Sequence, residues 1–157
     1  MAGGRLPAHM ETEKPPRAAG DHSAPPQAFC VNQDTQPLEG VNDAQSGNLS
    51  WRTLISADRA PSTELTVGVA DFPPHGRLNR HWHAPAEFYY GLSGEGTVTA
   101  NGVPLKIAKG IAVFIPGNTE HGIEAGAAGL SILYGFAQSA FCDIVYHYTQ
   151  TAPESPS

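Results

Sequence analysis

The residues best suited to chemistry lie in the stretch RHWHAPAEFYYGLSGEG, which runs from Arg80 to Gly96. His81 and His83 stand two residues apart, and Glu87 follows four residues after His83. Two neutral imidazoles and a carboxylate form a set of nitrogen and oxygen donors that suits a divalent first-row metal. The sequence therefore predicts a metal site centred on this stretch.

A β-strand is the element that would bring these side chains together. Side chains on a strand alternate between its two faces, so His81, His83 and Glu87 share one face if the strand continues through Ala84–Ala86. Tyr89 has the same parity, while its two neighbours point the other way. We therefore expect a phenol beside the metal donors.

A fourth candidate donor, His121, lies in the stretch GIAVFIPGNTEHGI, at the start of another expected strand that follows a Pro-Gly turn. Two other histidines have less suitable neighbours: His75 sits in the turn PPHG, and His147 lies near the C-terminus. We interpret both as surface or core residues, which leaves His121 as the best partner for the first three donors.

The residue pattern around these stretches is typical of an all-β protein. From Leu49 onward, short apolar runs alternate with turn signals, and no long segment has a helical period. The dipeptide Asn101-Gly102, between TVTA and VPLKI, is the strongest hairpin signal. About ten short strands in this part of the chain predict an antiparallel sandwich or barrel. The segment SAFCDI is compatible with a single helical turn.

Length and composition give the domain organisation. A chain of 157 residues is typical of one domain. Residues 1–36 are rich in Pro, Ala, Gly and charged residues and offer little apolar surface, so we expect a flexible tail. The predicted barrel covers residues 37–150, and residues 151–157 form a flexible C-terminus.

Charge and hydropathy exclude several classes of partner. Nine Lys and Arg against fifteen Asp and Glu give a net charge of −6, which disfavours nucleic acid and anionic membranes. Two cysteines are too few for a disulfide framework. The N-terminus has no apolar core of a secretory signal, and no apolar run is long enough to span a membrane. We expect a cytoplasmic location.

The two histidine-containing stretches resemble the two motifs of the cupin family. HWHAPAEFYYGLSG follows the order His-x-His, Glu, Gly of the first motif, and GIAVFIPGNTEH follows the order Gly, Pro, His of the second. Asn118 replaces a usual glycine, Ala125 stands where asparagine is common, and the early glycine is one place off at Gly76. The resemblance covers roughly residues 51–148. It implies a double-stranded β-helix, the cupin or jelly-roll barrel, holding one metal through His81, His83, Glu87 and His121.

Within the cupins, the chain resembles small single-domain lyases that cleave dimethylsulfoniopropionate. In those enzymes a tyrosine two residues after the metal-binding glutamate acts as the base, and Tyr89 occupies that position. The resemblance implies a β-elimination on a small carboxylate, giving dimethyl sulfide and acrylate. It also implies one divalent metal, which could be Fe, Mn, Ni or Zn, and a homodimer formed through edge strands.

Other activities share this donor set. A non-haem Fe(II) dioxygenase, an isomerase or cyclase, and a metal-binding sensor without turnover stay open at this point. Three further residues are weaker candidates for the substrate pocket. Tyr134 should face the core or the pocket, and Arg77 and Asn79 share the parity of His81 and could reach the barrel mouth. At the barrel mouth, the Arg77 side chain would either bind an anion or be exposed to solvent.

Overall fold

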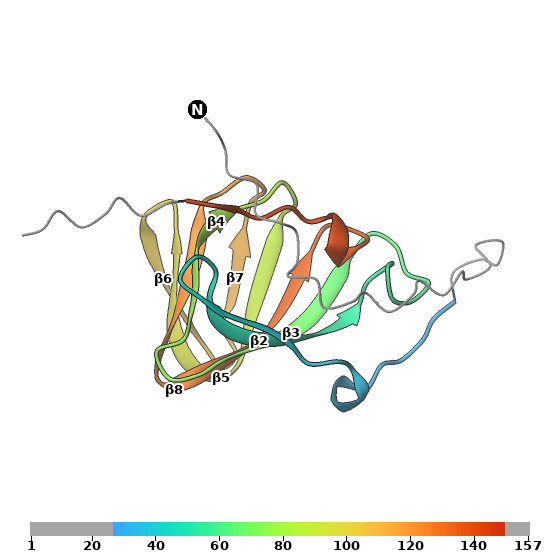
Figure 1. The fold of residues 1–157 in the computed structure, drawn as a ribbon, viewed down its shortest axis with the longest axis horizontal. Helices are drawn as coiled ribbons and strands as arrows, with labels where there is room; N and C mark the ends of the chain where they lie inside the picture. The colour runs from blue at the N-terminus through green and yellow to red at the C-terminus, as the bar shows by residue number, and fades with distance from the viewer. Residues whose placement is uncertain (1–26, 150–157) are drawn as a thin grey trace, which may run out of the picture.

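The computed structural model describes residues 27–149, and within them the chain forms nine β-strands and two short 3-10 helices (Figure 1). The strands are β1 (Glu39–Asp43), β2 (Gly47–Ile55), β3 (Thr66–Phe72), β4 (Arg77–Trp82), β5 (Glu87–Ala100), β6 (Val103–Ala108), β7 (Ala112–Ile115), β8 (His121–Phe136) and β9 (His147–Tyr148). The 3-10 helices are η1 (Gln33–Thr35) and η2 (Phe141–Asp143), and η2 is the expected helical turn in SAFCDI. The predicted all-β class is confirmed.

The strands close into a barrel because β8 has partners on both sides. β8 pairs with β3, β3 with β2, β2 with β4, and β4 again with β8, so the strand pairs form a ring. Every one of these pairings is antiparallel. The long strands β5 and β8 also pair along most of their length, and β6 and β7 extend the sheet from β5. The predicted barrel is confirmed.

The turn between β5 and β6 is the hairpin that Asn101-Gly102 predicts. Ala100 pairs with Val103 across it, and Asn101 and Gly102 have φ angles of 47° and 77°. Positive φ at both central residues matches the twist of the two flanking strands, and Asn-Gly adopts it at low cost. The dipeptide therefore fixes the register of this hairpin.

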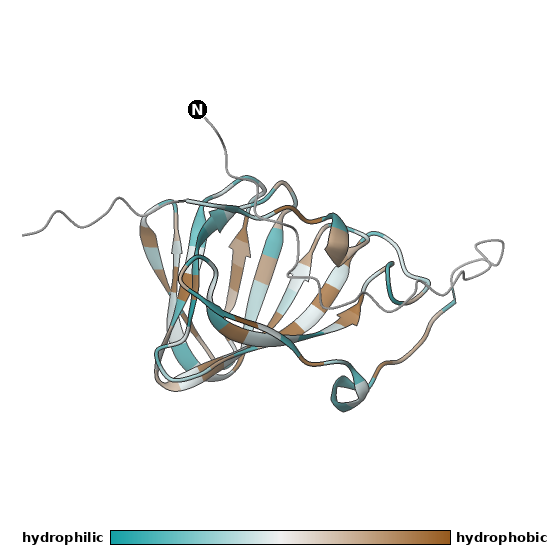
Figure 2. Cartoon of the chain, in the orientation of Figure 1, coloured by the Kyte–Doolittle hydropathy of each residue, from teal (hydrophilic) through white to brown (hydrophobic). Residues whose placement is uncertain are grey.

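Hydrophobic and hydrophilic residues alternate along several strands (Figure 2), and the hydrophobic ones that point inward form the core. The β5 residues Glu87, Tyr89 and Gly91 are buried, whereas Phe88 and Tyr90 are exposed. The β8 residues Leu130, Ile132, Tyr134 and Phe136 are buried in the same way. The core is thus contiguous through the barrel, and the side chains of His81, His83, Glu87 and His121 are buried in the same interior.

Residues 1–26 and 150–157 lie outside the described residues, so most of the expected tail and the expected flexible C-terminus stay predictions. Residues 27–36 contain η1, and the Arg52 guanidinium donates a hydrogen bond to the Gln36 carbonyl at the point where the chain approaches the barrel. Among the described residues, no helix has the length and apolar character needed to cross a membrane.

Candidate metal centre

The candidate metal centre is built from the ends of three strands. His81 lies near the end of β4, His83 just after it, Glu87 at the start of β5 and His121 at the start of β8. All four side chains are buried, and one ligand atom from each lies within 4.8 Å of all the others. The structure therefore brings together the four donors that the sequence singles out.

Backbone carbonyls set the orientation of the three imidazoles. The Nδ1 atoms lie 2.8–2.9 Å from carbonyl oxygens, in the pairs His81 with Asn79, His83 with Pro85, and His121 with Thr119. A carbonyl oxygen can only accept, so each Nδ1 carries the proton. A neutral imidazole then presents the lone pair of its Nε2 to the interior, as a metal ligand must.

The Nε2 atoms of His83 and His121 approach the carboxylate of Glu87. Its Oε2 lies 3.0 Å from His83 Nε2 and 3.1 Å from His121 Nε2. The Nε2 of His81 is buried with no hydrogen-bond partner among the described residues. Lone pairs that face each other repel, and a buried polar atom without a partner is costly. A divalent cation among these atoms would satisfy all of them, so the donor set fits a metal.

The barrel interior favours the protonation states that bind metal. Burial, followed by the nearby His121, lowers the pKa of His81 from 6.5 to about 3. Burial alone would raise the pKa of Glu87, but the close His121 and His83 imidazoles hold that pKa below its ordinary value. The interior thus contains a neutral imidazole at His81 and an anionic carboxylate at Glu87.

Tyr89 completes the cluster. Its hydroxyl donates a hydrogen bond to Glu87 Oε2 at 3.0 Å, and the side chain is only 1% exposed. Burial and then the negative charge of Glu87 raise the pKa of Tyr89 well above its ordinary value. A positive charge beside the hydroxyl would instead lower the pKa of Tyr89. Whether Tyr89 is ionised therefore depends on whether the four donors hold a cation.

Asn118 explains why the second motif tolerates a departure from glycine. Its φ angle is 61°, in the left-handed region that favours glycine and that asparagine also adopts. Its backbone N–H donates to the His83 carbonyl at 2.8 Å. The turn before His121 is thereby fastened to the segment that carries His83.

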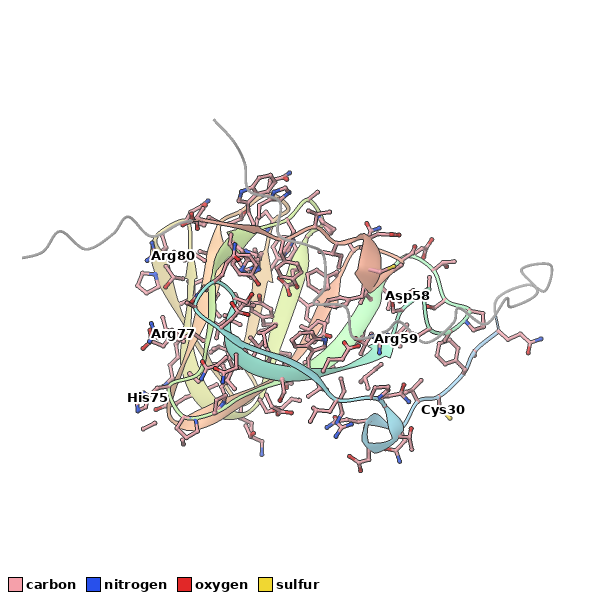
Figure 3. All side chains as sticks on the ribbon, viewed as in Figure 1. Cys30, Asp58, Arg59, His75, Arg77 and Arg80 are labelled. Atoms are coloured by element: carbon pink, nitrogen blue, oxygen red, sulfur yellow. The ribbon has the colours of Figure 1, made fainter. Side chains whose placement is uncertain are left out.

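The side chains of Arg77 and Asn79 are not brought to the metal donors, although the Asn79 carbonyl accepts a hydrogen bond from His81 Nδ1. The pairing of β4 with β8 shifts register between Leu78 and His81, so a β-bulge reverses the alternation that the sequence implies. Leu78 packs against the core, while the Asn79 amide donates to the Ala44 and Gln45 carbonyls. Figure 3 shows Arg77 at the outer margin of the barrel, where its side chain is exposed.

Tyr134 lies inside the barrel, next to Tyr89 on the neighbouring strand. Its side chain is 5% exposed, and burial raises the pKa of its hydroxyl. A Cβ at Gly68, its partner on β3, would lie 2.2 Å from that hydroxyl, so Tyr134 extends toward β3. This geometry packs Tyr134 against β3 and requires a glycine at position 68, and a role for Tyr134 in the substrate pocket stays a prediction.

The C-terminal segment adds two aromatic residues that the sequence analysis does not single out. Tyr146 stacks on His81 at a ring-centroid distance of 4.8 Å, and Tyr148 lies 5.5 Å from the same ring. Tyr148 is the pairing partner of His81 between β9 and β4. In Figure 1 this segment, drawn in red, runs along the upper end of the barrel. Tyr146 and Tyr148 stand two residues apart, a spacing that places both side chains on the same face of a strand. This spacing is the sequence signal that could have identified them.

An antiparallel barrel that buries three histidines and a glutamate at one end defines a cupin, and the chain belongs to this family. The model described as cupin domain matches residues 68–131. Over 133 residues the chain is 43% identical to the dimethylsulfoniopropionate lyase DddW of Ruegeria pomeroyi, which covers 85% of this chain and 86% of that protein. The resemblance to cupins of this type is therefore confirmed.

Solved structures confirm the cupin fold. The polyketide cyclase RemF from Streptomyces resistomycificus superimposes with a TM-score of 0.65 and 19% identity, over 82% of this chain and 89% of that one. A predicted oxalate decarboxylase from Thermotoga maritima gives a TM-score of 0.61 and 24% identity, over 70% of this chain and 99% of that one. At these identities the likeness concerns the fold alone.

Proposed function

We propose that the chain is a metal-dependent carbon–sulfur lyase that cleaves dimethylsulfoniopropionate into dimethyl sulfide and acrylate. The observation that carries the proposal is the Tyr89 hydroxyl, 3.0 Å from Glu87 Oε2 within the donor cluster. A base at this position is what a β-elimination needs next to a bound carboxylate. The relative DddW, 43% identical, is named for this lyase activity.

The metal would be held by His81, His83, Glu87 and His121, whose donor atoms lie within 4.8 Å of one another. Fe, Mn, Ni and Zn all accept mixed histidine and carboxylate ligands, and one of them is proposed here. When bound, the cation would act as a Lewis acid on the substrate carboxylate and would favour the phenolate form of Tyr89.

The residues of the chain would carry out the elimination in one base-assisted step. Tyr89 takes the proton from the α carbon, and the electron pair of that C–H bond forms the double bond between the α and β carbons. The C–S bond breaks, and its electron pair stays on sulfur. The products are neutral dimethyl sulfide, acrylate and one proton, which Tyr89 returns to solvent.

Aromatic rings beside the donors would bind the sulfonium end of the substrate. Tyr146 lies 4.8 Å from the ring of His81 and 5.5 Å from that of His83, and Phe136 lies 5.1 Å from His83. Aromatic faces attract cations electrostatically, most strongly where water is excluded. A zwitterion with its carboxylate at the metal would thus have its cationic end near an aromatic wall.

The experiment is a cleavage assay under nitrogen. The protein is loaded with each candidate metal and incubated with dimethylsulfoniopropionate, and dimethyl sulfide in the headspace and acrylate in solution are measured. Equal amounts of both products without oxygen support the lyase. Absence of product with every metal overturns the proposed substrate, and turnover seen only when the assay is repeated in air would instead indicate the dioxygenase alternative. A cytoplasmic location remains a prediction that this assay does not address.

A further inference from the structure

A polar cavity of about 400 Å³ lies at the surface of the barrel, and none of the four metal donors lines it. Its walls come from the end of β1, the turn into β2, and His75, Arg77 and Asn79 around the start of β4. Cavities that hold small ligands have volumes of roughly 300–1,000 Å³. This space, which we call the β1–β4 cavity, is therefore large enough for a small molecule.

Hydrogen bonds and a close backbone contact hold the walls of the β1–β4 cavity in place. The Asn79 side-chain amide donates to two carbonyls of the turn between β1 and β2, each at 3.0 Å. The Asn48 Oδ1 accepts a hydrogen bond from the backbone N–H of Arg77 at 2.9 Å. A Cβ at Gly47 would lie 2.1 Å from the Arg77 carbonyl oxygen, so β2 and β4 approach closely where both line the cavity. Walls that are fixed before binding lower the entropic cost of holding a ligand.

Two opposite charges line this cavity without pairing with each other. Among residues 27–149, neither the Arg77 guanidinium nor the Asp43 carboxylate forms an ion pair. Asp43 Oδ1 accepts backbone hydrogen bonds from Gln45 at 2.9 Å and from Ser46 at 2.6 Å, and these bonds orient the carboxylate. An unpaired cation and an unpaired anion in one cavity are complementary to a ligand that carries both charges.

His75 adds a hydrogen-bond donor to the same cavity. Figure 3 shows His75 and Arg77 along one margin of the barrel, and both line the cavity. The φ angle of His75 is 58°, in the left-handed region that is costly for residues other than glycine, and its backbone N–H donates to the Gly126 carbonyl at 3.1 Å. The fold thus holds an imidazole, which can donate a hydrogen bond in either protonation state, at the cavity that Arg77 lines.

We propose that the β1–β4 cavity binds a small zwitterion, with its carboxylate at Arg77 and His75 and its onium group at Asp43. The planar guanidinium of an arginine matches the two oxygens of a carboxylate, which sets the orientation of the ligand. The site is separate from the metal centre but shares one residue with its support, because the Asn79 carbonyl accepts a hydrogen bond from His81 Nδ1 at 2.8 Å. The proposal does not depend on the lyase activity, because its test measures binding.

The test titrates the full chain, with and without Zn²⁺, with glycine betaine and separately with alanine, two zwitterions without a C–S bond. We expect ¹⁵N–¹H NMR shifts in residues 42–48 and 75–79, with a Kd on the order of 1 mM because so few atoms make contact.

Two variants remove one charge each. Arg77→Gln and Asp43→Asn should each weaken binding at least about fivefold, and asparagine keeps the Oδ1 acceptor that orients the turn. The matched controls are Arg80→Gln and Asp71→Asn, at exposed residues that do not line the cavity, and they should bind as the wild type does.

Binding of neither zwitterion would overturn the proposal, as would wild-type affinity in both Arg77→Gln and Asp43→Asn. Shifts confined to residues 81–89 and 121, or seen only with Zn²⁺, would place the ligand at the metal centre and would also overturn it. Sodium acetate and tetramethylammonium chloride carry one of the two charges each. If either of these ions bound as tightly as the zwitterions, the cavity would not recognise both charges, and the proposal would be wrong.

Discussion

His81 on β4 and His121 on β8 are direct cross-strand partners, and their ring centroids lie 4.3 Å apart. The same pairing of β4 with β8 closes the ring of strands. The strand pairing that closes the barrel is therefore the same pairing that brings His81 and His121 together. A metal bound between these strands should stabilise the closed barrel, because a ligand that binds only the folded chain adds to its stability.

Replacement of His81 should abolish most metal binding. His81→Ala removes the ligand whose Nε2 is buried with no hydrogen-bond partner among the described residues, and we expect metal affinity to fall at least about tenfold. Metal content after dialysis measures this loss, and the metal-dependent rise in Tm should disappear as well. The control is His75→Asn, at an exposed histidine whose φ of 58° asparagine accepts. Equal metal content in His81→Ala and the wild type would contradict the proposed ligand set.

Removal of one hydroxyl should separate catalysis from folding. Tyr89→Phe keeps the buried ring but loses the group that lies 3.0 Å from Glu87, so kcat for dimethyl sulfide release should fall about 10²- to 10⁴-fold. Metal content should not change. Tyr90→Phe makes the same change one residue later, on the exposed side of β5, and should keep wild-type turnover. If Tyr89→Phe turned over at a rate near that of the wild type, another group would have to be the base.

The ring of Tyr146 should matter more for substrate binding than its hydroxyl. Because its ring stacks on His81 at 4.8 Å, Tyr146→Leu should raise KM for dimethylsulfoniopropionate about 2- to 30-fold, the range of a cation–π contact. Tyr146→Phe retains the aromatic face and should keep KM within about twofold of the wild type. Steady-state kinetics on the metal-loaded wild type and the two metal-loaded variants measure these KM values. Equal KM values for the Leu and Phe variants would exclude an aromatic contact with the sulfonium.

The metal-free protein should lose stability as the pH falls below neutrality. The pKa of His81 is about 3 in the folded chain and 6.5 in an exposed histidine, so between these values the unfolded chain binds a proton that the folded chain does not. The free energy of unfolding should then decrease as pH falls through this window, by up to about 1.4 kcal/mol for each pH unit. Urea unfolding in the presence of a chelator measures the slope, and His81→Gln should flatten it. Identical slopes for the two proteins would show that His81 does not contribute.

The hairpin and the four donors could be predicted because their signals are local. Asn101-Gly102 specifies its turn through the φ angles that two residues adopt, and the spacing of His81 and His83 specifies a shared face through the period of a strand. The pocket residues could not be predicted in the same way. The bulge between Leu78 and His81 depends on the register with β8, and it turns Arg77 and Asn79 away from the donors.

The sequence by itself determined which atoms could bind a metal, because the residue types and their spacing define the donor set. Only the tertiary structure decided what surrounds that set. Tyr146 and Tyr148 reach His81 because β9 pairs with β4, a contact between segments far apart in the chain. The proton on each Nδ1 is likewise set by carbonyl groups that the folded backbone places within hydrogen-bond distance. Long-range register and backbone geometry arise from the packing of the whole barrel, and a local pattern of residues does not encode them.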